Sequence, residues 1–285
     1  MNARRDTMIA AQYFVAVSGL AAMRRCLTEP SAVRPRLDDV CRVVEHLDEF
    51  PNNLEIPVIE HDVASGYAAW APRYDGPNPA LEAETPIVHA LLDGAPRGRA
   101  LDAACGTGRH AAHLASLGYD VVGVDATDAM LDVARAKLPT SQLLPGRLDA
   151  LPVDDASVDV LTCSLALTHV AALGPVLREF ARVVRPGGWV VTSDMHPIVV
   201  ALGGTAVFPG EPGTFDIRHV PNLLHGVSEY VTEERDAGLV VDACREAAVP
   251  ESAITTNPAY AAVPDGVREA FAGLPFILAW RFIRS

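Results

Sequence analysis

The sequence predicts an α/β fold in which a mostly parallel sheet carries helices on both faces. From residue 79 onward, short apolar runs typical of buried strands alternate with segments of helical character. The first of these runs ends in the glycine turn Gly106-Thr107-Gly108, and an alanine-rich helical segment follows it. A second glycine turn, within residues 185–188, leads from a helical segment into another apolar run.

The individual elements follow from the same pattern. Strands are expected at residues 99–104, 121–125, 142–148, 158–164 and 189–194. Helices are expected at residues 109–117, 128–137 and 173–184, and a later one at 227–237, where Gly238 stops it. Residues 185–188 are expected to form a turn, residues 203–213 a loop, and the apolar run 275–285 a last strand.

The N-terminal part of the chain has a different pattern and is expected to form a helical extension or cap over residues 1–64. Apolar residues recur at helical spacing between Leu37 and Leu47. The apolar run 9–23 is too short to span a bilayer, which takes roughly 20 residues, so a buried helix is expected there. Two roles for the extension stay open: a cap on an acceptor pocket, or a homodimer contact.

Composition and charge favour a small-molecule partner. The 285-residue chain has a formal net charge of −13 and no cluster of Lys or Arg beyond adjacent pairs, whereas nucleic-acid binders usually carry a basic patch. The five cysteines are widely spaced and lack a C-x-x-C motif, which argues against a disulfide framework and against a zinc site. We therefore expect no metal, no nucleic-acid partner, no membrane partner and a reducing, cytoplasmic location.

The glycine turn at residues 106–108 is typical of a nucleotide-binding loop. Ligands of open α/β sheets lie at the carboxyl ends of the strands, where glycines let the backbone approach the ligand. The helix that follows presents free N–H groups and the positive end of its dipole. Asp125 lies 19 residues after Gly106, where a carboxylate can accept hydrogen bonds from ribose hydroxyls. These features predict a ribonucleotide and do not separate NAD from S-adenosylmethionine.

Two further carboxylates favour S-adenosylmethionine. Asp102 lies four residues before Gly106, a good place for a ligand with an ammonium group and a poor one for a pyrophosphate. Asp149 follows the third expected strand and precedes Ala150 and Leu151. A carboxylate beside apolar residues suits adenine, because it can accept from the exocyclic amine while the ring packs on hydrocarbon.

Taken together, the motifs resemble the Rossmann-like (class I) S-adenosylmethionine-dependent methyltransferases of the small-molecule type. The matching segments are LDAACGTGRHAAHLASLGYDVVGVDATDAML, GRLDALPVDDASVDVLTCSLALTHV and LREFARVVRPGGWVVTSDMHP, and the resemblance covers residues 65–285. It implies a seven-stranded mixed sheet whose last strand is antiparallel. It also implies S-adenosyl-L-methionine as cofactor and methyl transfer to an O, N or C atom of a small organic acceptor.

The resemblance assigns a role to each matching residue. The residues that would lie along the methionine part of the cofactor are Asp102, Ala104, Gly106 and Gly108, with Ser164 near the ammonium group. Asp125 would hold the ribose hydroxyls, and the residues around the adenine would be Ala126, Met130, Asp149, Ala150 and Leu151. Ala104 stands where the family usually has a glycine, and alanine is tolerated there.

Two histidines and an aromatic segment are the candidates on the acceptor side. His169 follows the fourth expected strand and His196 the fifth, and histidine is the side chain most easily poised as a base near neutral pH. A structural hydrogen bond at a strand end is the alternative for each histidine. Residues 65–78 resemble a lid in which Tyr67 and Tyr74 would close over the cofactor and complete the catalytic pocket, while Arg73 would meet the methionine carboxylate. An aromatic staple for the N-terminal helices is the alternative for that segment.

Three other functions remain open. An enzyme of the same fold can use S-adenosylmethionine without methyl transfer, for instance in a cyclisation. An NAD-linked oxidoreductase would share the glycine loop, although Asp102 and Asp149 argue against it. A binding module without catalysis is the third. The sequence does not identify the acceptor.

Overall fold

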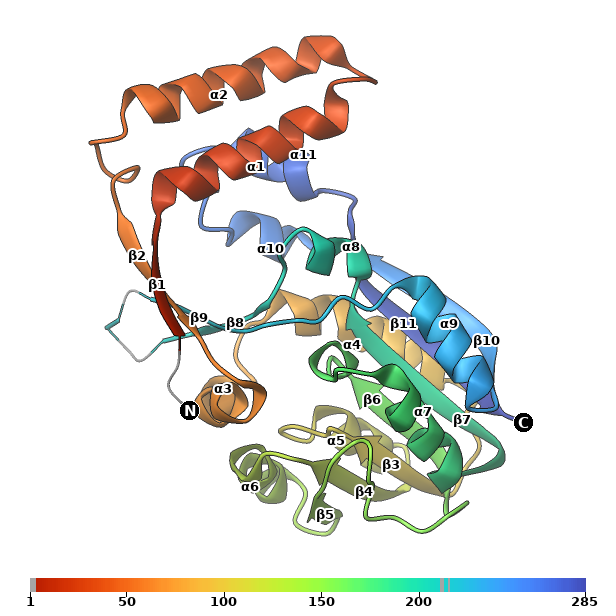
Figure 1. The fold of residues 1–285 in the computed structure, drawn as a ribbon. Helices are drawn as coiled ribbons and strands as arrows, with labels where there is room; N and C mark the ends of the chain where they lie inside the picture. Colours follow the sequence, from red (N-terminus) through yellow and green to blue (C-terminus); the bar gives the residue numbers. More distant parts are fainter. Residues whose placement is uncertain (1–3, 211–212, 215) are drawn as a thin grey trace. The chain divides into compact units, whose positions relative to one another are not determined.

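Two compact units make up the chain (Figure 1), and the computed structural model describes residues 4–210, 213–214 and 216–285. The larger unit contains residues 62–206, 220–247 and 275–285, and the smaller unit contains residues 1–61, 207–219 and 248–274. The smaller unit therefore differs from the contiguous extension that the sequence predicts over residues 1–64. Two later segments of the chain fold together with it.

A seven-stranded sheet forms the middle of the larger unit. Its strands are β3 (Arg99–Ala103), β4 (Asp120–Asp125), β5 (Gln142–Pro145), β6 (Val158–Ser164), β7 (Val184–Met195), β10 (Leu239–Ala248) and β11 (Pro275–Arg284). Their order across the sheet is β10-β11-β7-β6-β3-β4-β5. The strands from β7 to β5 are parallel, and β11 pairs with β7 in antiparallel. The predicted seven-stranded mixed sheet with an antiparallel last strand is confirmed.

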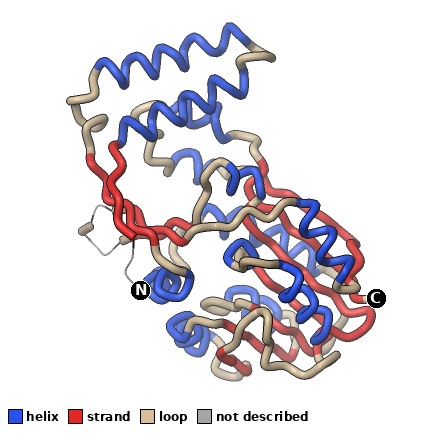
Figure 2. Tube along the Cα trace, in the orientation of Figure 1, coloured by secondary structure: helices blue, strands red, loops and turns tan. Residues whose placement is uncertain are grey.

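Helices cover both faces of this sheet (Figure 2). The helices of the larger unit are α3 (Val63–Trp70), α4 (Pro79–Leu92), α5 (Arg109–Ser116), α6 (Asp128–Lys137), α7 (Leu173–Val183), α8 (Pro197–Ala201) and α9 (Val227–Asp236), and its short 3₁₀ turns are η2 (Ala71–Arg73) and η3 (Leu167–His169). Successive residues of β3 pack into different apolar cores, because side chains along a strand point alternately to the two faces of the sheet. Leu101 packs in the core that contains Phe180 of α7, and Ala100 packs in the core that contains Leu114 of α5.

The smaller unit combines helices with a four-stranded sheet. Its elements are β1 (Arg4–Ile9), α1 (Ala10–Arg25), η1 (Pro30–Ala32), α2 (Val33–Glu45), β2 (Glu55–Glu60), β8 (Ala206–Pro209), β9 (Ile217–Val220), α10 (Glu251–Thr255) and α11 (Pro264–Phe271). Phe14 and Val17 of α1 share an apolar core with Val267 and Ala270 of α11. The two expected N-terminal helices are present, but β1 and β2 were not expected. In the described part of the chain, no helix has the length and apolar character needed to cross a bilayer.

Some local expectations for the larger unit were wrong. The expected turn at residues 185–188 lies inside β7, where Gly187 has a φ of +79° and the pairing with β6 shifts between Val158 and Val160. β5 ends at Pro145, before the expected end at residue 148, because its partner β4 ends at Asp125 and the chain then turns between Arg147 and Ala150, which form an isolated antiparallel bridge. β10 was missed because most of its residues are exposed and polar side chains interrupt its apolar pattern.

Candidate functional site

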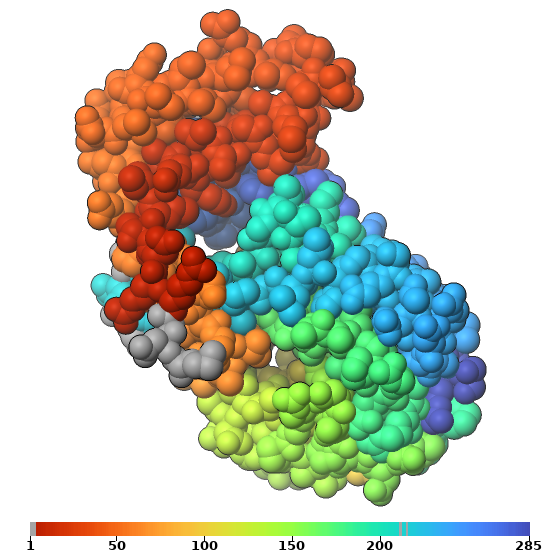
Figure 3. All heavy atoms as spheres, in the orientation of Figure 1, coloured from red at the N-terminus to blue at the C-terminus, as the bar shows by residue number. Residues whose placement is uncertain are grey.

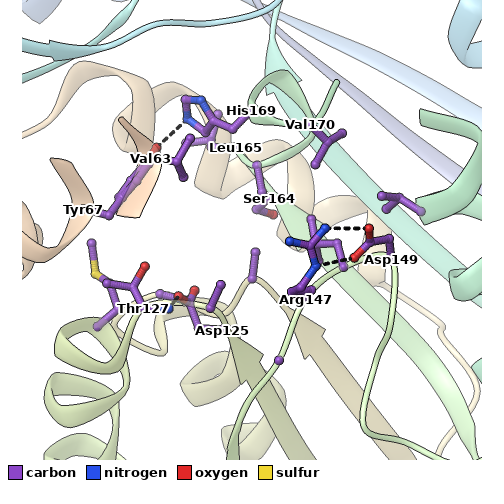
Figure 4. A pocket seen from close by; sticks show the side chains of 18 of the residues that line it. Val63, Tyr67, Asp125, Thr127, Arg147, Asp149, Ser164, Leu165, His169 and Val170 are labelled. Atoms are coloured by element: carbon purple, nitrogen blue, oxygen red, sulfur yellow. Dashed lines mark hydrogen bonds and ion pairs between the residues drawn. The ribbon is translucent and has the colours of Figure 1, made fainter. Parts of the chain in front are cut away.

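The carboxyl ends of β3, β4, β5 and β6 border a cavity of about 480 Å³ in the larger unit (Figure 4). The surface is hollowed between the yellow-green and green segments of that unit (Figure 3). The residues proposed from sequence that line the cavity are Tyr67, Tyr74, Ala104, Gly106, Asp125, Ala126, Met130, Asp149, Ser164 and His169. Lining residues that sequence reasoning missed include Val63, Thr127, Arg147, Leu148, Leu165, Ala166, Val170 and Val176.

The glycine loop and Asp125 hold each other in place. Gly106 has a φ of +53°, and its backbone N–H donates to Oδ2 of Asp125 at 2.8 Å. Oδ1 of the same carboxylate accepts from the backbone N–H of Thr127, also at 2.8 Å. Burial raises the pKa of Asp125, while the backbone hydrogen bonds from Thr127 and Gly106 oppose the rise. The carboxylate is thus fixed at the cavity wall by two main-chain donors.

Asp102 and Gly108 have structural contacts and do not line the cavity. The buried Asp102 carboxylate accepts from Thr162 Oγ1 at 2.8 Å and from the backbone N–H of Ala111 at 2.9 Å, so it joins β3 to β6 and to the start of α5. Both of its oxygens are therefore engaged within the protein, unlike the ammonium contact expected from sequence. A Cβ on Gly108 would lie 3.0 Å from Leu138 Cδ1, so this glycine lets the loop pack against α6.

Arg147 forms an ion pair with Asp149, the residue whose carboxylate was expected to bind adenine. Its Nε donates to Asp149 Oδ1 at 2.9 Å and its terminal nitrogen to Oδ2 at 2.7 Å (Figure 4). This bidentate pair lowers the pKa of Asp149. Ala150 and Leu151 are not among the lining residues, and Leu151 is a buried core residue whose N–H donates to Glu179. Of these three residues, Asp149 alone lines the cavity, and Arg147 already contacts both of its carboxylate oxygens.

The segment from α3 to Asp75 forms one wall of the cavity. Tyr67 and Tyr74 both line it, and their rings flank Trp70 at centroid distances of 5.8 and 4.8 Å. Burial raises the pKa of Tyr74 to about 12. Asp75 fastens the segment, because it accepts from Thr107 Oγ1 of the glycine loop at 2.7 Å and pairs with Lys137 of α6. Arg73 is not among the lining residues.

The two candidate histidines have different surroundings. His169 lines the cavity, and its Nε2 lies 2.7 Å from the hydroxyl of Tyr67, which is 102 residues away in the sequence (Figure 4). Its Nδ1 lies 3.1 Å from the carbonyl oxygen of Pro221. His196 does not line the cavity; its Nε2 lies 3.0 Å from Glu246 and its Nδ1 accepts from the N–H of Ile198.

A buried ionic cluster behind the glycine loop escaped sequence reasoning. Glu84 of α4 is fully buried and contacts Arg109 at 2.5 Å, His110 at 2.9 Å and Ser193 at 2.7 Å. Burial alone would raise the pKa of Glu84, but His110 and Arg109 together bring it below its ordinary value. The cluster ties α4 to the start of α5 and to β7. The sequence signal for this cluster is a glutamate among the apolar residues of a helix, because a buried carboxylate needs charged or polar partners.

The comparisons with known proteins agree with this architecture. Residues 101–192 match a family model described as a methyltransferase domain. A malonyl-[acyl-carrier protein] O-methyltransferase from Yersinia pestis is 40% identical over 33% of this chain and 36% of its own length. A demethylmenaquinone methyltransferase from Renibacterium salmoninarum is 34% identical over 48% of this chain and 60% of its own length. The chain thus spans less than two thirds of the length of either relative.

A solved structure extends the comparison to the fold. A S-adenosylmethionine-dependent methyltransferase from Mesorhizobium loti aligns with a TM-score of 0.54 and 23% identity, over 71% of this chain and 98% of that one. In the described residues, no group of three or more His, Cys, Asp or Glu side chains is arranged to hold a metal ion. Residues 101–192 thus match a methyltransferase domain, and the larger unit has the Rossmann-like (class I) fold of that solved S-adenosylmethionine-dependent methyltransferase.

Proposed function

We propose that the protein is an enzyme that transfers the methyl group of S-adenosylmethionine to an O, N or C atom of a small organic acceptor. The observation that carries this proposal is the cavity, which brings the glycine loop, Asp125 and the pair Tyr67–His169 to one place. The net charge of −13 and the apolar lining by Val63, Leu165 and Val170 support a small acceptor of mainly apolar character. The relative named for demethylmenaquinone points the same way.

Two features of the cavity fit the cofactor. A Cβ built on Gly106 would meet no heavy atom within 4 Å, so the loop leaves open space on its cavity side. The Ser164 hydroxyl is buried in the cavity lining and has no hydrogen-bond partner among the described residues, so it is available to a polar group of a ligand. Asp125 would hold the ribose hydroxyls, and Ala104, Ala126 and Met130 would pack along the cofactor.

The other residues proposed to serve the cofactor would have roles that differ from those expected from sequence. Asp102 and Gly108 would act by shaping the loop, since both are engaged in packing. Asp149 would accept from adenine's amine in competition with Arg147. Tyr74 would exclude water from the reacting atoms as part of the cavity wall.

When bound, the cofactor supplies a methyl group already activated on a sulfonium, so the protein has to align an acceptor and accept its proton. The contact of His169 Nδ1 with the carbonyl of Pro221 places the ring proton on Nδ1 and leaves the Nε2 lone pair facing Tyr67. Burial lowers the pKa of His169, against the opposing effect of that carbonyl, so the ring is neutral at neutral pH. An acceptor's proton can pass to the Tyr67 oxygen as the Tyr67 proton passes to Nε2.

Ligand binding and turnover test the proposal separately. S-adenosylhomocysteine at 100 times its dissociation constant should stabilise the protein by about 2.7 kcal/mol. Stabilisation by NAD alone would exclude the proposed cofactor. Release of S-adenosylhomocysteine with an acceptor is then expected, whereas acceptor conversion without that release would identify a non-methylating reaction such as cyclisation.

A matched pair of histidine variants tests the proton acceptor. His169→Gln should lower kcat by about 10²–10⁴-fold with an acceptor whose proton has a high pKa. His196→Gln should keep wild-type turnover, since its ring lies outside the cavity lining. The reverse result would assign the base to His196.

A further inference from the structure

We propose that Asp194 is a positioning residue for His169: its carboxylate holds the η3 turn that presents the imidazole, and protonation of this carboxylate lowers turnover. The inference rests on the proposed function, because it concerns the proton-accepting histidine. Asp194 is not itself among the residues that line the cavity.

The geometry connects Asp194 directly to the η3 turn. Asp194 lies at the carboxyl end of β7 and is 3% exposed. Its Oδ1 accepts from both the backbone N–H of Thr168, at 3.2 Å, and the Thr168 hydroxyl, at 3.1 Å. Its Oδ2 accepts from the Tyr230 hydroxyl of α9 at 3.4 Å. Thr168 is the residue before His169, so this carboxylate fixes the backbone from which the imidazole projects.

Two contacts with main-chain carbonyl groups also support the turn. The carbonyl oxygen of Thr168 accepts from the N–H of Leu223 at 2.7 Å. Nδ1 of His169 donates to the carbonyl of Pro221 at 3.1 Å. The carbonyl groups do not ionise, but the turn has two ionisable supports besides His169 itself: Asp194, and His225, whose Nε2 lies 2.9 Å from the carbonyl oxygen of Val170. Asp194 is the one that contacts Thr168 directly, so its ionisation sets how firmly Nε2 of His169 is held against Tyr67.

The surroundings of Asp194 place its ionisation near neutrality. Burial raises its pKa to about 7, although the hydrogen bonds from Thr168 and Tyr230 favour the charged form. The titratable groups that face it are Tyr230 of α9, Cys163 of β6 and Tyr67 of α3. Burial raises the pKa of all three, so they stay neutral while Asp194 titrates.

The sign of the effect follows from hydrogen-bond chemistry. Above about pH 7 the carboxylate is an acceptor for every donor around it. Below that pH one oxygen carries a proton, so the charge assistance to the hydrogen bonds from Thr168 and Tyr230 is lost. Turnover should therefore rise with pH through about 7 as Asp194 ionises. The titration of His169 itself lies lower, because burial lowers its pKa.

The pH profile of turnover tests this inference with two variants. Asp194→Asn cannot ionise and should lose the limb near pH 7, with kcat reduced about tenfold at pH 8 and KM for the cofactor within about twofold of wild type. Tyr230→Phe removes a donor that favours the charged form, so the midpoint of the limb should move to higher pH while the plateau rate is kept. A purely structural role would change rates and stability without moving that midpoint.

A measurement on the unliganded protein separates this inference from the proposed function. The NMR signal of the His169 ring, identified by its absence in His169→Gln, should shift with a midpoint near pH 7 in the wild-type protein and not in Asp194→Asn. A wild-type ring signal without that inflection, or an inflection that persists in Asp194→Asn, would overturn the inference even if methyl transfer is found. The expected ring titration without any methyl transfer would instead count against the proposed function alone.

Discussion

The buried carboxyl group of Glu234 leads to a prediction about how the free energy of unfolding depends on pH. Glu234 lies on α9, is 0% exposed, and neither side-chain oxygen has a hydrogen-bond partner among the described residues. Burial raises its pKa to about 9, so the folded protein keeps it protonated at neutral pH. We predict that Glu234→Gln, which cannot ionise, is more stable than the wild-type protein at neutral and alkaline pH.

The magnitude follows from the pKa values of the two states. Below the ordinary pKa of 4.5, Glu234 is protonated in both states and adds no pH dependence. Between 4.5 and about 9 the folded state keeps a proton that the unfolded state has released, so the free energy of unfolding falls as pH rises. The slope is about 1.4 kcal/mol per pH unit, which amounts to about 3.4 kcal/mol at pH 7.

Urea denaturation of the wild-type and Glu234→Gln proteins at several pH values measures this effect. In the window from about pH 7.5 to 8.5 Glu234 still keeps its proton, whereas Asp194, whose pKa burial raises to about 7, is mostly ionised. The advantage of the variant should grow by about 1.4 kcal/mol across that window. Glu233→Gln, one residue earlier on the same helix, should keep the wild-type slope, because Glu234 is intact in it.

An advantage of Glu234→Gln that does not change with pH would refute the reasoning, because it would reflect side-chain packing and not ionisation. A variant that is less stable than wild type at pH 8.5 would refute it more directly. It would mean that the charged carboxylate has a partner worth more than its burial costs.

The remaining predictions concern the cavity and its supports. Gly108→Ala should lower the free energy of unfolding by about 1–3 kcal/mol in thermal unfolding, because the φ of Gly108 is +84° and a Cβ there would lie 3.0 Å from a leucine side chain. Gly106→Ala should cost about 1 kcal/mol, because a Cβ there meets open space. Equal losses of stability in the two variants would contradict this reasoning. Arg147→Ala should tighten S-adenosylhomocysteine binding about three- to tenfold in calorimetry by freeing Asp149, and should not do so when Asp149 is also replaced by Ala. Asp75→Ala should weaken the same binding about three- to tenfold by releasing the wall segment, and unchanged affinity would show that its two contacts do not order the cavity.

Much of the larger unit could be predicted from sequence, because its strands and helices are marked by patterns within each segment. Apolar runs and glycine turns gave the positions of β3, β4 and β6 and of α6 within a residue or less. The same reasoning missed β1, β2 and β10 and the two later segments that join the smaller unit. Those elements depend on pairing with distant strands or on packing against α1, and such contacts leave no periodic signature in the segment itself.

The sequence by itself determined the fold class, the resemblance to the methyltransferase family, and the place of Gly106 and Asp125 at one edge of the sheet, because strand order and the glycine turn follow from local pattern. Only the tertiary structure decided which side chains are available there. It brought Tyr67 to His169 across 102 residues, left His196 outside the cavity lining, and engaged Asp102 with internal donors. The physical reason is that hydrogen bonds form between whichever groups folding brings within about 3 Å, and chain spacing does not fix those distances.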